Sequence, residues 1–205
     1  IGGPSSSGKT TFSKRLCIQL RVNGFRPVVI AADDFFVNRE LTPRGEDGEY
    51  DFEAFEAIDY HYLNRVIRGL LAGETMQMPR FDFPSGMRKK GATLRLEKNQ
   101  IIILEGIHSL NHRLLSEIPD GLKYRIYVSA LTTLNVDNHN RVFTSDSRLL
   151  RRIVRDSQFR NYPARETIGR WPSVRRGEEK NIFPYQENAD VMFNSALVYE
   201  VGVLK

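Results

Sequence analysis

The feature that most constrains this chain is the stretch GPSSSGKT at residues 3–10, which satisfies the pattern G-x-x-x-x-G-K-[ST]. Its two fixed glycines permit backbone angles and close approaches that a side chain would forbid. The loop N–H groups and the N-terminus of the following helix then favour a bound phosphate. An ordinary Gly/Ser-rich turn is the alternative. However, Phe12, Leu16 and Leu20 share one helical face, so the helix that a P-loop requires is predicted to follow.

Two side chains of this loop have specific expected partners. We expect Lys9 to reach the β- and γ-phosphates of ATP, and the Thr10 hydroxyl to ligate Mg²⁺. ATP and Mg²⁺ are therefore the expected cofactors. The residues predicted to bind nucleotide are Gly3, Pro4, Ser5, Ser6, Ser7, Gly8, Lys9, Thr10 and Thr11.

Length and composition indicate a single α/β domain over residues 1–205. The net charge of +5 is modest, and a polyanionic small molecule explains it as easily as nucleic acid does. Cys17 is the only cysteine, which excludes a disulfide framework and a cysteine-rich metal site. No apolar run approaches 18 residues and no signal peptide is visible, so we expect a cytoplasmic protein without a membrane partner.

The start of the chain is unusual for this motif. A P-loop needs a strand running into it, yet only Ile1 and Gly2 precede the loop, and no initiator Met is present. We therefore expect a fragment of a longer chain, whose first strand lies largely upstream. A further N-terminal domain stays open.

An acidic pair follows the second predicted strand. Residues 27–32 form a continuous apolar run, typical of a parallel strand covered on both faces, and Asp33 and Asp34 come next. Ligands in open α/β sheets bind beyond the carboxyl ends of the strands. One of these carboxylates is therefore predicted to be the catalytic base, although capping or a solvated turn would be the usual reading of an arbitrary Asp-Asp.

Residues 38–50 are polar and are predicted to form a loop. An amphipathic helix is expected over residues 53–71, because its apolar residues have nearly helical spacing. Asp51 precedes this helix. Its carboxylate could cap the helix or bind substrate hydroxyls, and the residues alone do not separate these two roles.

The next segments predict a β-ribbon inserted at about residues 76–98, since residues 76–83 and 92–96 alternate around Pro84-Ser85-Gly86. The ribbon carries Arg88-Lys89-Lys90, a charge run that usually marks a solvated edge. Within this run, Arg88 is retained as a candidate for contact with substrate.

Residues 100–106 give the clearest strand, with four large aliphatic residues followed by Glu105. Glu105 is predicted to approach Mg²⁺ in the manner of a Walker-B acid. His108 and His112 follow without a convincing metal-ligand spacing, so a structural role is expected. Residues 124–129 and 189–194 are the remaining predicted strands, which gives a parallel five-stranded sheet.

Positive charge is concentrated in the C-terminal third of the chain. Arg148, Arg151, Arg152 and Arg155 have the spacing of one helical face, and residues 141–180 hold ten arginines. A nucleic-acid patch would need an interleaved aromatic platform, which is absent. In a phosphotransferase such a face offsets the charge of the transferring phosphoryl group. We therefore predict Arg148, Arg151 and Arg152 to be catalytic residues of a helical lid at about residues 148–188. Residues 157–188 are poorly periodic and are predicted to be mobile.

With these segments in hand, the chain resembles the uridine kinase and phosphoribulokinase family of P-loop kinases over nearly its whole length. The resemblance rests on residues 3–10, Asp33-Asp34-Phe35-Phe36, Tyr50-Asp51-Phe52, Phe81-Asp82-Phe83, Leu104-Glu105-Gly106, 148–156 and Ala189-Asp190. It implies a three-layer α/β sandwich of the nucleoside/nucleotide kinase type. It also implies that Asp33 rather than Asp34 is the base, that Asp51 holds the ribose hydroxyls, and that Phe81 contacts the nucleobase.

The sequence departs from the resemblance at two positions that matter for specificity. Uridine–cytidine kinases carry a base-reading histidine where this chain has Gly86, and Phe81 replaces a tyrosine. The segment 105–111 is also similar to bacterial uridine-kinase-like proteins with a TGS-type domain upstream. The expected partners are ATP and a nucleoside-like small molecule rather than nucleic acid, and oligomerisation stays open.

The expected reaction is transfer of the γ-phosphoryl of ATP to the 5′-hydroxyl of a nucleoside such as uridine or cytidine. Two alternatives remain. One is a kinase for another small alcohol, such as a sugar phosphate or a different riboside. The other is a nucleotide-dependent, RNA-associated binding module.

Overall fold

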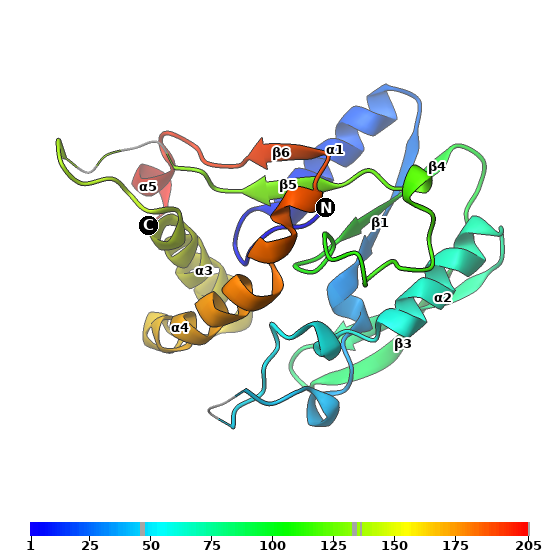
Figure 1. Cartoon of the computed structure of the whole chain (residues 1–205), viewed down its shortest axis with the longest axis horizontal. Helices are drawn as coiled ribbons and strands as arrows, with labels where there is room; N and C mark the ends of the chain where they lie inside the picture. The colour runs from blue at the N-terminus through cyan, green and yellow to red at the C-terminus, as the bar shows by residue number, and fades with distance from the viewer. Residues whose placement is uncertain (46–47, 133–134, 136, 205) are drawn as a thin grey trace.

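The computed structural model describes residues 1–45, 48–132, 135 and 137–204 (Figure 1). Residues 46 and 47 of the predicted loop lie outside this description. The helices are α1 (Lys9–Val22), α2 (Tyr60–Leu71), α3 (Thr144–Arg160), α4 (Ala164–Asn181) and α5 (Glu200–Val203). The strands are β1 (Arg26–Ala31), β2 (Met76–Asp82), β3 (Met87–Leu94), β4 (Gln100–Glu105), β5 (Ile126–Ser129) and β6 (Val191–Asn194). Short 3₁₀ turns include η1 (Ala32–Phe35), η3 (Phe55–Ala57) and η5 (Phe183–Asn188).

The central strands form two parallel pairs, β1 with β4 and β5 with β6. Ile1 and Gly2 lie between the pairs: the Gly106 N–H donates to the Ile1 carbonyl at 3.1 Å, and Gly2 bridges Tyr127 in parallel. The described residues therefore do not form the predicted continuous five-stranded sheet. Two residues join the pairs at one end only, because they are too few to run the length of β4.

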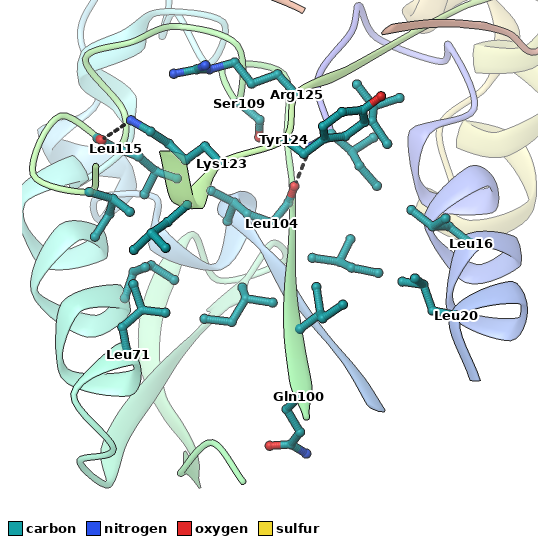
Figure 2. Close-up of a pocket in the computed structure, with 18 of the residues that line it drawn as sticks. Leu16, Leu20, Leu71, Gln100, Leu104, Ser109, Leu115, Lys123, Tyr124 and Arg125 are labelled. Atoms are coloured by element: carbon teal, nitrogen blue, oxygen red, sulfur yellow. Dashed lines mark hydrogen bonds between the residues drawn. The ribbon is translucent and has the colours of Figure 1, made fainter. Parts of the chain in front are cut away.

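A groove of about 550 Å³ opens beside β4 where the two pairs diverge. Figure 2 shows apolar side chains on both sides of β4, with Leu16 and Leu20 of α1 on one side and Leu71 of α2 on the other. Tyr124 and Arg125 border the groove near the start of β5. No residue of the stretch 3–10 lines this groove, so the groove is separate from the P-loop.

Helix α2 begins later than the sequence predicted. It starts at Tyr60 instead of residue 53, because the Asp59 side chain caps it by accepting from the Tyr62 N–H at 3.0 Å. Residues 55–57 form the separate turn η3. Leu63, Val66 and Leu70 then point into the main core together with Phe35 of η1.

The predicted ribbon is formed by antiparallel β2 and β3, which meet across a turn at Gly86. The second strand starts at Met87, earlier than the alternation of residues 92–96 indicated. The pairing shifts between Gln77 and Pro79, where proline lacks the N–H that a regular ladder needs.

The poorly periodic segment 157–188 of the predicted helical lid is largely helical. Helix α4 covers Ala164–Asn181 despite Pro172. It buries Thr167, Trp171, Val174 and Glu178, which recur at helical spacing. Helix α4 packs against α3, and Figure 1 shows this pair apart from α2 and the ribbon. Among the described residues, none of the helices combines the length and apolar character needed to cross a bilayer.

Candidate active site

The stretch 3–10 forms a tight loop leading into α1. Gly3 has φ +148°, and a Cβ at this position would come within 2.1 Å of the Val128 carbonyl oxygen. Gly8 precedes α1 with φ +93° in the left-handed region, and Ser6 also has a positive φ. The backbone therefore requires glycine at both fixed positions.

The Lys9 side chain is buried against this loop. Its Nζ donates to the carbonyl oxygens of Gly3 at 2.9 Å and Pro4 at 3.0 Å. Burial lowers the pKa of Lys9, and the negative charges of Glu105 and Asp33 oppose that shift. The ammonium group is thus held by two weak acceptors, which a phosphate oxygen can replace.

The two predicted Mg²⁺ ligands come together although they are far apart in sequence. The Thr10 hydroxyl at the start of α1 donates to Glu105 Oε1 at the end of β4, at 2.8 Å. Both groups offer oxygen, the ligand that Mg²⁺ prefers. The Thr10–Glu105 pair therefore fits a Mg²⁺ ion whose remaining ligands would be water and nucleotide phosphates.

The acidic pair after β1 is divided between two environments. Asp34 Oδ1 accepts from the Phe81 N–H at 3.1 Å, which ties η1 to the ribbon. The pKa of Asp33 is raised to about 6, mainly by desolvation and then by the nearby negative charge of Glu105, while Lys9 opposes the shift. Of the two acids of the pair, Asp33 is therefore the one that shares an electrostatic environment with the P-loop lysine.

The first predicted catalytic arginine is enclosed. Arg148 is fully buried, and its guanidinium pairs with both carboxylate oxygens of Glu178 in α4. The same guanidinium donates to the Ser5 carbonyl at 3.0 Å, and Glu178 Oε1 accepts from the Ser5 N–H at 3.0 Å. In this arrangement Arg148 holds the P-loop and is not open to a ligand.

Arg151 and Arg152 also contact the loop, from the same face of α3. Arg151 pairs with Glu200 and donates to Ser195 and, at 3.4 Å, to the Ser6 carbonyl. Arg152 donates to Ser5 Oγ at 2.7 Å. The predicted arginine face thus packs on the P-loop, with Arg148 and Arg151 already neutralised by glutamates.

The three predicted acceptor-binding residues have separate surroundings. Asp51 Oδ1 accepts from the Glu53 N–H at 3.0 Å, so Asp51 shapes a turn and does not cap α2. Phe81 is buried edge-on against Phe36, at 5.5 Å between ring centroids. Arg88 pairs with Asp59 at 2.9 Å, which ties the ribbon to the start of α2.

The position of the missing histidine is occupied differently. Gly86 has φ +69°, and a Cβ there would meet the Arg39 side chain at 2.6 Å. Arg39 donates to the Phe83 carbonyl at 2.7 Å, and its own N–H donates to the Gly86 carbonyl. Arg39 therefore covers the turn from which a histidine would have projected.

Two residues of this region were not predicted. Arg160 at the end of α3 lies over the Phe83 ring at 5.7 Å and contributes positive charge at Asp33. Glu53 lies close enough to Lys9 and Asp33 for their charges to affect its pKa. Arg160 continues the arginine spacing of α3 imperfectly, and Glu53 was assigned to a helix, so the sequence carried only a weak signal for either.

The family model described as "Phosphoribulokinase / Uridine kinase family" matches residues 1–201. The chain belongs to this family. Relatives include a uridine kinase of Macrococcus caseolyticus, 27% identical over 94% of this chain and 84% of the relative. Another is the uridine-cytidine kinase 2-B of Danio rerio, 26% identical over 94% of this chain and 70% of the relative. The expected P-loop kinase family is thus confirmed.

Solved structures support the same fold. A structure described as a possible uridine kinase from Bacillus stearothermophilus has TM-score 0.58 and 21% identity, over 94% of this chain and 85% of that one. A second, from Silicibacter sp. TM1040 and named for a fructose transport system kinase, has TM-score 0.63 and 22% identity over 94% and 86%. Solved structures with this fold therefore carry names that refer to different kinds of kinase.

Proposed function

We propose that this family member transfers the γ-phosphoryl group of ATP to a primary hydroxyl of a nucleoside-like acceptor. The observation that carries the proposal is the convergence of three functions at the P-loop. Lys9 is held at the loop, Thr10 pairs with Glu105, and the carboxylate of Asp33 shares their electrostatic environment.

In the proposed reaction, Asp33 accepts the proton of the acceptor hydroxyl as its oxygen bonds to the γ-phosphorus. The bond to the bridging oxygen breaks and ADP leaves with that electron pair. Lys9 and Arg152 offset negative charge on the phosphoryl oxygens. A bound Mg²⁺ would be held by Thr10 and Glu105 and would neutralise charge between the β- and γ-phosphates.

The acceptor is proposed to be a riboside that is read mainly through its sugar. With Gly86 covered by Arg39 and an apolar Phe81, no histidine or tyrosine hydroxyl is available at these two positions to read a base. Apolar contact discriminates only about 10- to 200-fold, whereas a hydrogen-bonding site rejects an analogue that lacks the group by about 10⁴-fold. We therefore expect weak selection among bases and strong selection against 2′-deoxyribose.

The proposal is tested by ADP release with uridine, cytidine, other ribosides, deoxyuridine and sugar phosphates. We expect kcat/KM to vary less than about 200-fold among ribosides and to fall steeply for deoxyuridine. A preference of more than about 10³ for one base would mean that an unidentified residue reads it.

A second candidate is a kinase for a sugar phosphate, and the covering of Gly86 by Arg39 favours it, because a guanidinium suits an anionic acceptor. Turnover of sugar phosphates alone would select this candidate. ADP release with no acceptor, together with tight salt-dependent RNA binding, would instead favour a binding module.

A further inference from the structure

Glu53 lies on a turn that is fixed from two directions. Its N–H donates to Asp51 Oδ1 at 3.0 Å, and its carbonyl accepts from Asn181 Nδ2 of α4 at 3.0 Å. Gly177 of α4 packs so closely that a Cβ there would meet Glu53 Cβ at 2.4 Å. Asp51, Asn181 and Gly177 therefore leave the Glu53 backbone little freedom.

One oxygen of the Glu53 carboxylate is enclosed and unmatched. Oε2 is buried and has no hydrogen-bond partner in the part of the chain that the structure describes. A buried carboxylate oxygen normally accepts a hydrogen bond, because losing its hydration without one is unfavourable. An exception inside a candidate active site points to a donor that arrives with a ligand.

The charged groups around Glu53 come from four elements. They are Lys9 at the start of α1, Asp33 of η1, Arg152 of α3 and Glu178 of α4. Desolvation is the main reason that the pKa of Glu53 is raised to about 7, with the two acids adding to the shift and the two cations opposing it.

The two neighbouring cations make other contacts. Lys9 donates to the Gly3 and Pro4 carbonyls, and Arg152 donates to Ser5 Oγ. The buried Arg152 Nε lies 3.4 Å from Asp156 and has no hydrogen-bond partner among the described residues. Neither cation is hydrogen-bonded to Glu53 among the described contacts. In this arrangement these two cations therefore do not supply the donor that Oε2 lacks, and a hydroxyl of a bound ligand can supply it.

We propose that Glu53 is a substrate-binding residue whose Oε2 accepts a hydrogen bond from a second hydroxyl of a polyol acceptor. This inference rests on the proposed kinase function. Asp51, to which the resemblance assigns the ribose hydroxyls, then acts as a positioning residue that fixes the Glu53 backbone. Within residues 50–53, Asp51 orients the turn and Glu53 contacts the acceptor.

The test compares Glu53→Ala and Glu53→Gln with Glu56→Gln. Glu56 is an exposed acid of the adjacent turn η3, 3.4 Å from Arg113, and serves as the matched control. Acceptor affinity is measured by calorimetry in the presence of a non-hydrolysable ATP analogue, so binding is read without turnover. ATP affinity and Tm are measured in parallel, and ADP release is assayed separately.

We expect Glu53→Ala to weaken acceptor binding about 10- to 100-fold, as for loss of a hydrogen bond to a charged group. ATP affinity should change less than about twofold, and Glu56→Gln should match the wild type. Because the unmatched buried charge is removed, Tm of Glu53→Gln should equal or exceed that of the wild type at pH 8. A structural role would lower Tm and weaken both ligands together.

Other outcomes separate the two proposals. If the wild type binds a polyol but releases no ADP, the kinase function is overturned. The role of Glu53 would still be tested by the polyol affinity of its variants. Unchanged acceptor affinity in Glu53→Ala, with a loss in Asp51→Asn, would return the hydroxyl contact to Asp51. Absence of polyol binding to the wild type would overturn both proposals.

Discussion

Two carboxylates near the P-loop, Glu178 and Glu53, differ in what surrounds them. Glu178 is fully buried but lies between Arg148 and Arg175, and it accepts from the Ser5 N–H. Glu53 has an enclosed oxygen that lacks a hydrogen-bond partner among the described residues, and Asp33 nearby is also desolvated. A buried acid that is paired with arginines, such as Glu178, holds the structure together, and we call its surroundings the matched side. A buried acid without such a pair is unfavourable for stability and is a candidate for ligand binding, and we call the surroundings of Glu53 and Asp33 the unmatched side.

The largest effect is expected at the unmatched side. Asp33→Asn should lower kcat by a factor on the order of 10²–10⁴ with ATP affinity nearly unchanged, because the amide cannot accept the hydroxyl proton. Asp34→Asn is the control, since an amide oxygen can still accept from the Phe81 N–H. Steady-state kinetics and nucleotide titration check both variants. An equal loss in Asp34→Asn would overturn the assignment of the base.

At the matched side, the expected effect is on stability. Glu178→Gln leaves the Arg148 guanidinium buried without a counter-charge, which should cost about 3–5 kcal/mol in the free energy of unfolding. Urea unfolding measures this loss, with Glu179→Gln, the exposed neighbour in α4, as the control. Replacing both partners, as in Arg148→Met with Glu178→Leu, should recover part of the loss. A cost below about 1 kcal/mol for Glu178→Gln would remove the contrast.

The stability that Asp33 and Glu53 contribute should depend on pH. The raised pKa values of Asp33 and Glu53, about 6 and about 7, mean that both carboxylates are more easily protonated in the folded than in the unfolded chain. Their contribution to stability is therefore present below their unfolded pKa values and is lost as pH rises through about 6 to 7. We expect Asp33→Asn to raise Tm by a few degrees at pH 8 but not at pH 4.

Activity should change with pH in the opposite direction, because the base must be ionised. We expect kcat/KM for the acceptor to rise through about pH 6 to 7 and to level off above. In Glu53→Gln the upper step should disappear. A flat profile between pH 5 and 8 would contradict ionisation of these groups in the free enzyme.

The smallest effect is expected at the outer edge of the matched side. Arg175 is partly exposed and lies 3.2 Å from Glu178 and 3.3 Å from Glu179. Arg175→Ala should therefore cost less than about 1 kcal/mol, because Arg148 alone still neutralises Glu178. Thermal unfolding at low and high salt provides the measurement, and a loss comparable to that of Glu178→Gln would mean that Arg175 is the main partner.

Sequence patterns predicted the parts of the fold that local chemistry determines. The glycine spacing around Lys9, the apolar runs of β1 and β4 and the alternation of the ribbon each specify their own element. The bounds of helix α4 were not predicted, because Pro172 and two glycines interrupt its helical pattern. The spacing of its buried residues is explained only by their packing in the folded chain. The late start of α2 was missed because Asp59 caps it in the middle of an apolar period.

In the candidate site, too, local sequence patterns identified some residues, whereas contacts between distant parts of the chain determine the others. Thr10 and Glu105, the predicted Mg²⁺ ligands, could be named from the sequence because a P-loop and an acid after a buried strand are local signals, and their side chains lie in contact. Whether an arginine of α3 is free or neutralised depends on Glu178 and Glu200, which are distant in sequence. Glu53 could not be singled out, because its enclosed carboxylate oxygen and its contacts with Gly177 and Asn181 are evident only in the folded chain.

The contacts of Arg151 have a consequence for how nucleotide binding could be observed. This guanidinium joins the Ser6 carbonyl of the P-loop to Ser195 and to Glu200 of α5. Ser195 Oγ also donates to the Ser7 carbonyl. Any ligand that rigidifies the P-loop should thereby slow amide hydrogen exchange at residues 195–204. The segment after β6 would then report loop occupancy from outside the catalytic centre.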